Sequence, residues 1–358
     1  MWENSESFLL GLPVRMIYST YIAELSPILS LIEGPKFRSR HIRFYQKVPC
    51  HIRGLLNSAK ILLKYQKTYR NYTSVIKHIL QKRYPAEAIL KDGQKVMLTN
   101  FELSYNLVRL QDQQKVAFDI ENDAVLISDP TDLNSRSLKL KGGLRNGETV
   151  NIFVQDLYHN FPIKGKIVID VGANIADSCI YFASQGAKRI VGVEPLIENY
   201  EFAKQNVKLN NFSNRISMVL AGCGARPGYV DIDVDKQNGI GWQLGSSSNR
   251  GNTIPLLTLE QILQQSNVAE DEAALKLDCE GCEYDVILSS SDNVLRRFSN
   301  ILIEYHYGYN DIKEKLEKLN FNVSLVNIAG NPGGPTAVPN PKNLRKWFYM
   351  GYIHAKRK

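Results

Sequence analysis

Acidic side chains and one histidine stand at the ends of four apolar runs in this sequence. The six residues are Asp170, Glu194, Asp278, Glu280, Glu304 and His306. If the runs are parallel strands of one open sheet, their carboxyl ends meet at the edge where such sheets bind ligands. Carboxylates and an imidazole placed there could bind hydroxyl or amino groups and remove a proton from a reacting hydroxyl. We therefore expect these side chains to form one site.

The sequence from Asp170 to Glu194 has half of a nucleotide-binding pattern. It reads as strand, glycine turn, helix, strand and acid, and Glu194 follows Asp170 by 24 residues, near the spacing at which a carboxylate binds ribose hydroxyls. The turn offers Gly172, Asn174 and Asp177 where a dinucleotide site has three glycines around a pyrophosphate. Because these acids repel a pyrophosphate and suit a cationic ligand, they favour S-adenosylmethionine over NAD. A turn without any ligand is the alternative.

Several motifs, in order along the chain, resemble the FkbM family of S-adenosylmethionine-dependent methyltransferases. The resemblance covers about residues 151–309, with Ala176 in place of a common family glycine. Its motifs are Asp170–Ile175, Val193–Pro195, Asn206–Asn210, Thr258–Leu259, Lys276–Glu283 and Ile303–His306. The resemblance implies a class I methyltransferase fold and O-methylation of sugars or glycoconjugates.

The resemblance also implies a binding site for S-adenosylmethionine. Asp170, Gly172 and Asn174 would lie against the methionine end of this cofactor, with Ala173 in the same turn. Glu194 would hold the ribose hydroxyls. Ala221 or its neighbours would approach the adenine.

The acceptor side of the site needs mainly to position a hydroxyl, because the methyl group of a sulfonium is already activated. A base within hydrogen-bond reach would assist. Our candidates are Asp278, Glu280, Glu304 and His306, with His306 or Asp278 favoured as the base. A purely structural role for His306 is the alternative.

Metal binding is an alternative role for the same residues. The acids and the histidine could hold a divalent ion that acidifies the hydroxyl, but our predicted site includes no metal ligand. The pair Cys279 and Cys282 lacks the second pair that a zinc site needs. A redox role for this pair is a second interpretation.

The order of expected elements predicts an α/β fold. From about residue 151, strands alternate with helices, and two late strands, at 323–327 and 348–354, would form an antiparallel edge. We expect a class I methyltransferase (Rossmann-like) fold, with a mostly parallel sheet and helices on both faces, over residues 151–358. The polar stretch 237–252 is a candidate lid, and a helix over 152–159 could cover the cofactor.

Two segments precede that domain. Residues 1–85 form a basic helical segment, since 36–85 contains thirteen Lys or Arg and no Asp or Glu, against a net charge of +8 for the whole chain. Its apolar residues keep helical spacing from about residue 50 to 84. Residues 86–150 read as short strands separated by turns, a small β-rich lead-in. The basic residues 36–83 could contact an anionic surface (lipid, a phosphate carrier or RNA) or simply be solvated.

Composition and cysteine usage predict a cytoplasmic protein, with a peripheral position at a membrane as the alternative. The 358-residue chain is 44% hydrophobic, it starts without the basic region of a signal peptide, and no apolar run reaches the roughly 20 residues of a membrane span. Five cysteines are an odd number, which argues against a disulfide framework and for a reducing compartment.

Three functions therefore compete. The first is O-methylation of a sugar hydroxyl on a saccharide or glycoconjugate. The second is methylation of RNA through the basic segment, although the sequence lacks an Asn-Pro-Pro-aromatic motif after the fourth strand of the domain and a Pro-Cys there. The third is a non-catalytic protein that binds S-adenosylmethionine.

Overall fold

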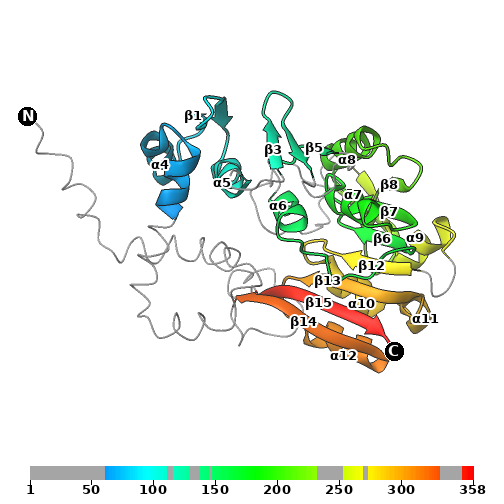
Figure 1. Ribbon diagram of the computed structural model, residues 1–358. Coiled ribbons are helices and arrows are strands. Elements are labelled where there is room, and N and C mark those ends of the chain that lie inside the picture. Colours follow the sequence, from blue (N-terminus) through cyan, green and yellow to red (C-terminus); the bar gives the residue numbers. More distant parts are fainter. Residues whose placement is uncertain are drawn as a thin grey trace, which may run out of the picture.

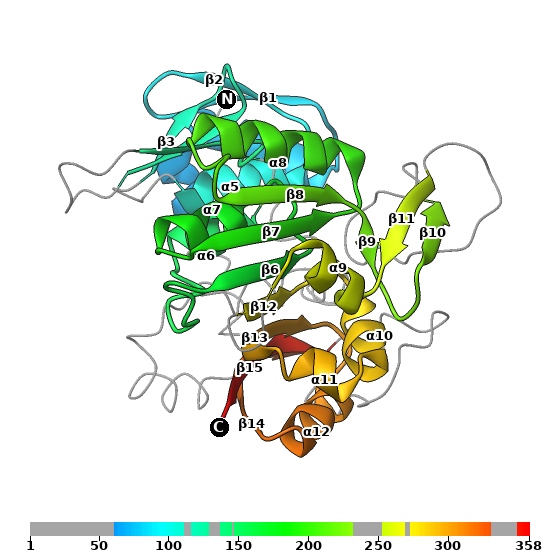
Figure 2. The same cartoon turned by 90° about the vertical axis from the view of Figure 1, so that its right-hand side faces the viewer.

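The structure, a computed structural model, describes residues 61–110, 116–128, 137–144, 147–231, 253–268, 273–330 and 349–358. Its largest element is a seven-stranded sheet with the order β14-β15-β13-β12-β6-β7-β8 (Figures 1 and 2). The strands are β6 (Ile167–Val171), β7 (Arg189–Glu194), β8 (Ile216–Leu220), β12 (Ala273–Leu277), β13 (Phe298–Tyr305), β14 (Phe321–Gly330) and β15 (Tyr349–Arg357). The predicted sheet is confirmed.

Strand direction follows the predicted pattern. The strands β8, β7, β6, β12 and β13 are parallel, and β15 runs antiparallel to β13 and to β14. The chain builds outward from β6 to β8 and then resumes on the other side of β6 with β12. The strand order therefore reverses between β6 and β12, and the crevice at that point is where open α/β sheets bind ligands. This is the class I methyltransferase order.

Two hydrophobic clusters cover the two faces of the sheet, because successive strand residues point to opposite sides. Val168 and Ile190 belong to the cluster under α7 and α8, whereas Ile167 and Ile169 belong to the cluster with α9, α10 and α12. The helices are α6 (Glu148–Phe153), α7 (Asp177–Ser184), α8 (Ile197–Leu209), α9 (Leu259–Gln265), α10 (Cys282–Ser289), α11 (Asp292–Leu295) and α12 (Asn310–Lys318). Helices on both faces were predicted, and Thr258 caps α9 as expected, accepting from Gln261 N.

The segment before the large sheet packs onto it. Its elements are a helical stretch at 61–68, α4 (Tyr72–Leu80), β1 (Ala86–Ile89), β2 (Lys95–Leu98), α5 (Phe101–Leu110), β3 (Val116–Asp119), β4 (Ala124–Ile127) and β5 (Leu138–Lys141). Buried side chains from Tyr65 to Leu144 join one cluster with those of α6 and α7. Whether residues 1–85 and 86–150 act as separate units stays a prediction.

Helix α5 was not among the predicted elements of the lead-in. Its buried residues Leu103, Leu107 and Leu110 have helical spacing, and the side chain of Asn100 accepts a hydrogen bond from Leu103 N at 2.8 Å. The short strands on either side obscured this pattern. The helix expected over 152–159 also lies earlier in the chain, because α6 begins at Glu148 and ends at Phe153.

Two asparagines fasten the lead-in to the large sheet. Asn206 of α8 accepts a hydrogen bond from Lys141 N at 2.8 Å and donates to Ile175 O at 2.9 Å. Asn210 accepts from Lys139 N at 2.9 Å. The motif Asn206–Asn210 therefore holds β5 against the domain and the turn that follows β6.

Three smaller strands lie beside the large sheet. They are β9 (Gly222–Cys223), β10 (Gly228–Asp231) and β11 (Thr253–Leu257), with β11 between the other two. The candidate lid at 237–252 and the late loop at 331–348 lie outside the described residues. Within the described ranges, no helix has both the length and the apolar composition of a membrane span.

Candidate active site

The turns after β6 and β12 are in direct backbone contact. Gly172 has a φ of +79°, and a Cβ atom built on it would lie 1.7 Å from the carbonyl oxygen of Asp278. Only glycine fits there. The sequence suggested that Gly172 lets a ligand approach the backbone, whereas in the structure it lets the next strand approach.

Asp170 lies buried beneath this contact. The hydroxyl of Ser178 donates to its Oδ2 at 2.6 Å and the thiol of Cys179 does so at 3.2 Å, while Lys276 Nζ lies 3.1 Å from Oδ1. Asp170 is 0% exposed, so its contacts in the structure are internal. Its contact with the methionine end of a cofactor stays a prediction.

Lys276 is the buried cation at the centre of the site. It is the register partner of Asp170 across β6 and β12, and its Nζ donates to Gly172 O at 2.8 Å and lies 3.7 Å from Asp278 Oδ2. Burial alone would lower the pKa of Lys276, but Asp170 and Asp278 hold that pKa above its usual value. Lys276 therefore joins both turns as a charged side chain.

Glu194 links the ends of β6, β7 and β8. Its carboxylate accepts hydrogen bonds from Asn174 N at 2.8 Å and Leu196 N at 2.9 Å, and its backbone oxygen accepts from Ala221 N at 3.3 Å. Burial raises the pKa of Glu194 to about 7. Ala173 lies in the same turn, buried, with its N–H donating to Val193 O at 3.1 Å. The predicted cofactor-binding residues thus lie at one edge of the sheet.

His306 follows β13 and lies between two carboxylates. Its Nδ1 is 3.1 Å from Glu283 Oε1, and its Nε2 is 3.3 Å from Glu280 Oε2. Burial would lower the pKa of His306, but Glu283 and Glu280 hold that pKa well above its usual value. The two carboxylates favour the protonated form of the imidazole, which makes His306 a poorer proton acceptor and Asp278 the better candidate for the base.

Three of the four candidate catalytic residues come together. Single ligand atoms of Asp278, Glu280 and His306 all lie within 4.8 Å of one another. Glu304, the fourth, is directed to β15, where the Tyr352 hydroxyl donates to its Oε2 at 2.7 Å. Burial, and then Asp278 and Glu148, raise the pKa of Glu304 well above its usual value. Its surroundings therefore favour the neutral form of the Glu304 carboxyl group.

Three further residues shape the site without having been assigned a role from the sequence. Lys276 lies in an otherwise apolar strand. A lysine in such a strand needs a buried counter-charge, so its position in the sequence could have predicted this ion pair. Glu283 is fully buried on α10 and accepts from both His306 and Cys279 N, the latter at 2.9 Å. Burial, then Asp278 and Asp177, raise the pKa of Glu148 to about 7. No sequence signal singled out Glu148.

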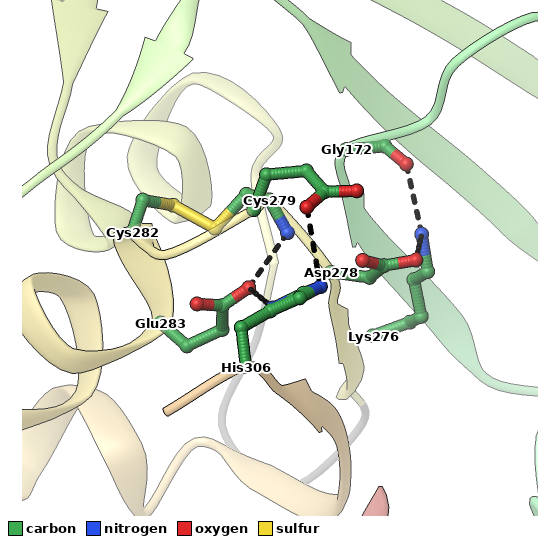
Figure 3. The surroundings of a disulfide bond; sticks show 8 residues. Gly172, Lys276, Asp278, Cys279, Cys282, Glu283 and His306 are labelled. Atoms are coloured by element: carbon green, nitrogen blue, oxygen red, sulfur yellow. Dashed lines mark hydrogen bonds and ion pairs between the residues drawn. A yellow bond between two sulfur atoms is a disulfide. The ribbon is translucent and has the colours of Figure 1, made fainter. Parts of the chain in front are cut away.

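A disulfide joins Cys279 and Cys282 beside these carboxylates, with 5.5 Å between the Cα atoms (Figure 3). The expectation from an odd cysteine count was wrong for this pair. An odd number of cysteines argues against a set of disulfides that spans the whole chain, but it does not exclude one local bond. This bond closes a four-residue turn that contains Gly281, which has a φ of +117°. Cys179 and Cys223 are free and buried.

Residues 170–324 match the family model of the methyltransferase FkbM domain. No curated protein matches the chain. This match covers all the candidate site residues.

Solved structures of methyltransferases resemble this chain at low similarity. Magnesium protoporphyrin IX methyltransferase from Synechocystis, with bound S-adenosylmethionine, has 12% identity and a TM-score of 0.32, over 59% of this chain and 79% of that chain. A putative tRNA (m1A22) methyltransferase from Streptococcus pneumoniae, in complex with S-adenosylmethionine, has 12% identity and a TM-score of 0.36, over 56% and 71%. These similarities are too low to support any conclusion about this protein. The match of residues 170–324 to the FkbM domain model is independent of them.

Proposed function

We propose that this protein, whose residues 170–324 match the methyltransferase FkbM domain, transfers the methyl group of S-adenosylmethionine to a sugar hydroxyl of a saccharide or glycoconjugate. The observation that carries the proposal is the backbone contact between Gly172 and Asp278. In this contact the turn expected to bind the donor lies against the backbone of Asp278, whose carboxylate is expected to serve the acceptor.

The residues at the ends of β6 and β7 fit S-adenosylmethionine. Glu194 is fixed by two backbone N–H groups, which leaves its carboxylate rigid enough to orient two ribose hydroxyls. The surrounding carboxylates of Asp170 and Asp278 suit a ligand with a sulfonium and an amino group. When bound, this cofactor supplies an activated methyl group.

The charge of the acceptor side favours a neutral, hydroxyl-bearing acceptor. Asp278, Glu280 and Glu283 lie close together, and Lys276 and His306 are the cations paired with them in the described part of the chain. Carboxylates accept hydrogen bonds from sugar hydroxyls, whereas they repel the phosphates of a nucleic acid. This supports a saccharide over RNA.

Proton removal falls to Asp278. Its carboxyl group is 18% exposed, so an acceptor can reach it. As the acceptor oxygen forms its bond to the methyl carbon and the carbon–sulfur bond breaks, the hydroxyl proton passes to Asp278. The products are the methyl ether, the neutral thioether and one proton, which leaves to solvent.

Transfer of labelled methyl groups tests the proposal. Incubation with labelled S-adenosylmethionine and separated glycan, lipid and RNA fractions should label the glycan-containing fractions. Asp278→Asn should lower kcat about 100-fold or more while retaining S-adenosylmethionine affinity by calorimetry. The control, Glu201→Gln on the exposed side of α8, should match wild type. Label found only in the RNA fraction would show that the acceptor is RNA and would refute the saccharide proposal.

For the basic segment we propose contact with an anionic surface in the cytoplasm. In its described part, Lys67 and Lys77 are exposed on helices whose opposite side is buried, and Arg70 is exposed in the turn between these helices. Reversing Lys67 and Lys77 to Glu should weaken binding to anionic vesicles, measured by sedimentation. Unchanged binding would count against the proposal, and binding of RNA instead would change the partner.

A further inference from the structure

We infer that Asp278, Glu280 and His306 form a binding site for a divalent metal ion of the Mn²⁺ type. The three side chains come from the turn after β12 and from the residue after β13, and one ligand atom of each lies within 4.8 Å of the others. This revises the expectation of a site without metal ligands.

The spacing of the ligand atoms suits a metal ion. His306 Nε2 and Glu280 Oε2 are 3.3 Å apart. Neighbouring ligands of an ion with bonds of about 2.1 Å lie about 3 Å apart, so this pair already has the separation of adjacent ligands. Glu280 is directed toward the histidine by its turn, in which Glu280 has a φ of +58° and Gly281 one of +117°.

Glu283 orients the histidine for metal binding. Its buried carboxylate lies 3.1 Å from His306 Nδ1, and the same oxygen accepts from Cys279 N, as Figure 3 shows. When a metal ion takes the place of the Nε2 proton, a carboxylate on Nδ1 keeps the remaining proton there and leaves the Nε2 lone pair directed at the ion, the arrangement found behind many metal-bound histidines.

An independent observation is the environment of His306 Nε2. The His306 side chain is 5% exposed, and its Nε2 lies 3.3 Å from Glu280 Oε2, close enough for a proton on Nε2 to form an ion pair with this carboxylate. A metal ion would take the place of that proton, because a histidine nitrogen binds a metal only when it is deprotonated. Lys276 does not fill this place, because its closer partners are Asp170 and Gly172.

The site is open on one side. The Glu280 side chain is 40% exposed, which gives an ion a path of entry. Three protein ligands leave positions for water or for an acceptor hydroxyl, whose acidity a bound ion would raise. Only this last step rests on the proposed function, since metal binding itself needs neither the cofactor nor the acceptor.

Mn²⁺ binding by the full-length protein, freed of metal with a chelator and measured by electron paramagnetic resonance, tests the inference. We expect one bound Mn²⁺ whose spin-echo signal carries modulation from an imidazole nitrogen. Glu280→Gln should weaken binding at least about tenfold, and His306→Gln should also remove the nitrogen modulation. The control Glu201→Gln should bind as wild type does.

Several outcomes would overturn the inference. They are no Mn²⁺ binding at millimolar concentration, equal affinity in Glu280→Gln and wild type, or nitrogen modulation that persists in His306→Gln. Because Glu280 is partly exposed, its variant stays interpretable if the histidine variant fails to fold. Absence of methyl transfer to glycans would refute the proposed function and leave this result unaffected.

Discussion

A Cβ atom added to Gly172 would lie 1.7 Å from the backbone carbonyl oxygen of Asp278, closer than two such atoms can approach. The turns after β6 and β12 therefore meet in a direct backbone contact. This relationship makes the first prediction direct.

Gly172→Ala should destabilise the fold strongly, because the added methyl group collides with backbone that cannot turn away. Chemical denaturation should show a loss of about 3 kcal/mol or more. Gly165→Ala is the matched control: it has a similar φ of +76° with nothing within 4 Å of the added atom. It should lose only about 1 kcal/mol. Equal losses would mean that backbone conformation alone sets the cost.

Lys276→Met should expose the cost of an unpaired buried carboxylate. We expect the free energy of unfolding to fall by about 3–5 kcal/mol, because Asp170 keeps its burial and loses its cation. Adding Asp170→Asn to this variant should recover part of the loss. Lys204→Met, which breaks an exposed pair with Glu201, should change stability by less than about 1 kcal/mol. No recovery in the double variant would contradict the pairing.

Glu194 should make the protein less stable as pH rises. Its folded pKa is raised to about 7 by burial, so between pH 4.5 and 7 the folded state holds a proton that the unfolded state has released. The stability from Glu194 is thus present below pH 4.5 and lost as pH rises to about 7. Denaturation curves across this range should have a shallower pH slope in Glu194→Gln than in wild type. An unchanged slope would refute the raised pKa.

The disulfide should be detectable by alkylation. In denatured protein without reductant, Cys179 and Cys223 should react while Cys279 and Cys282 do not, and all should react after reduction. Mass spectrometry of the peptides reads this directly. The variant with serine at both 279 and 282 should lose about 2 kcal/mol or less, since the closed loop is short. Ready alkylation of Cys282 without reductant would show that the bond is absent.

The central sheet was predictable because each strand carried its own signal. Buried parallel strands appear as short apolar runs, and the acids that follow these runs predict that Asp170, Glu194 and Asp278 lie on one rim of the sheet. The approach of Glu283 to His306 was not predictable in this way. It depends on how α10 packs beside β13, which no local pattern encodes.

The role of His306 shows the same limit. A histidine at a strand end is compatible with a base, with an ion pair or with a metal ligand, and the sequence left these alternatives open. The role of the imidazole depends on the carboxylate of Glu283, which contacts it from a position 23 residues earlier in the chain. Similarly, α5 was obscured by the strands around it, although its buried leucines have a clear helical spacing.

The last strand has a consequence for biosynthesis. β15 lies between β13 and β14, and β14 pairs only with β15 in the described sheet. During translation, β14 is synthesised before residues 349–357 and has no neighbour to pair with until they emerge from the ribosome. The sheet therefore closes only after these residues emerge, and until then both β13 and β14 expose unpaired edges on which chaperones can act.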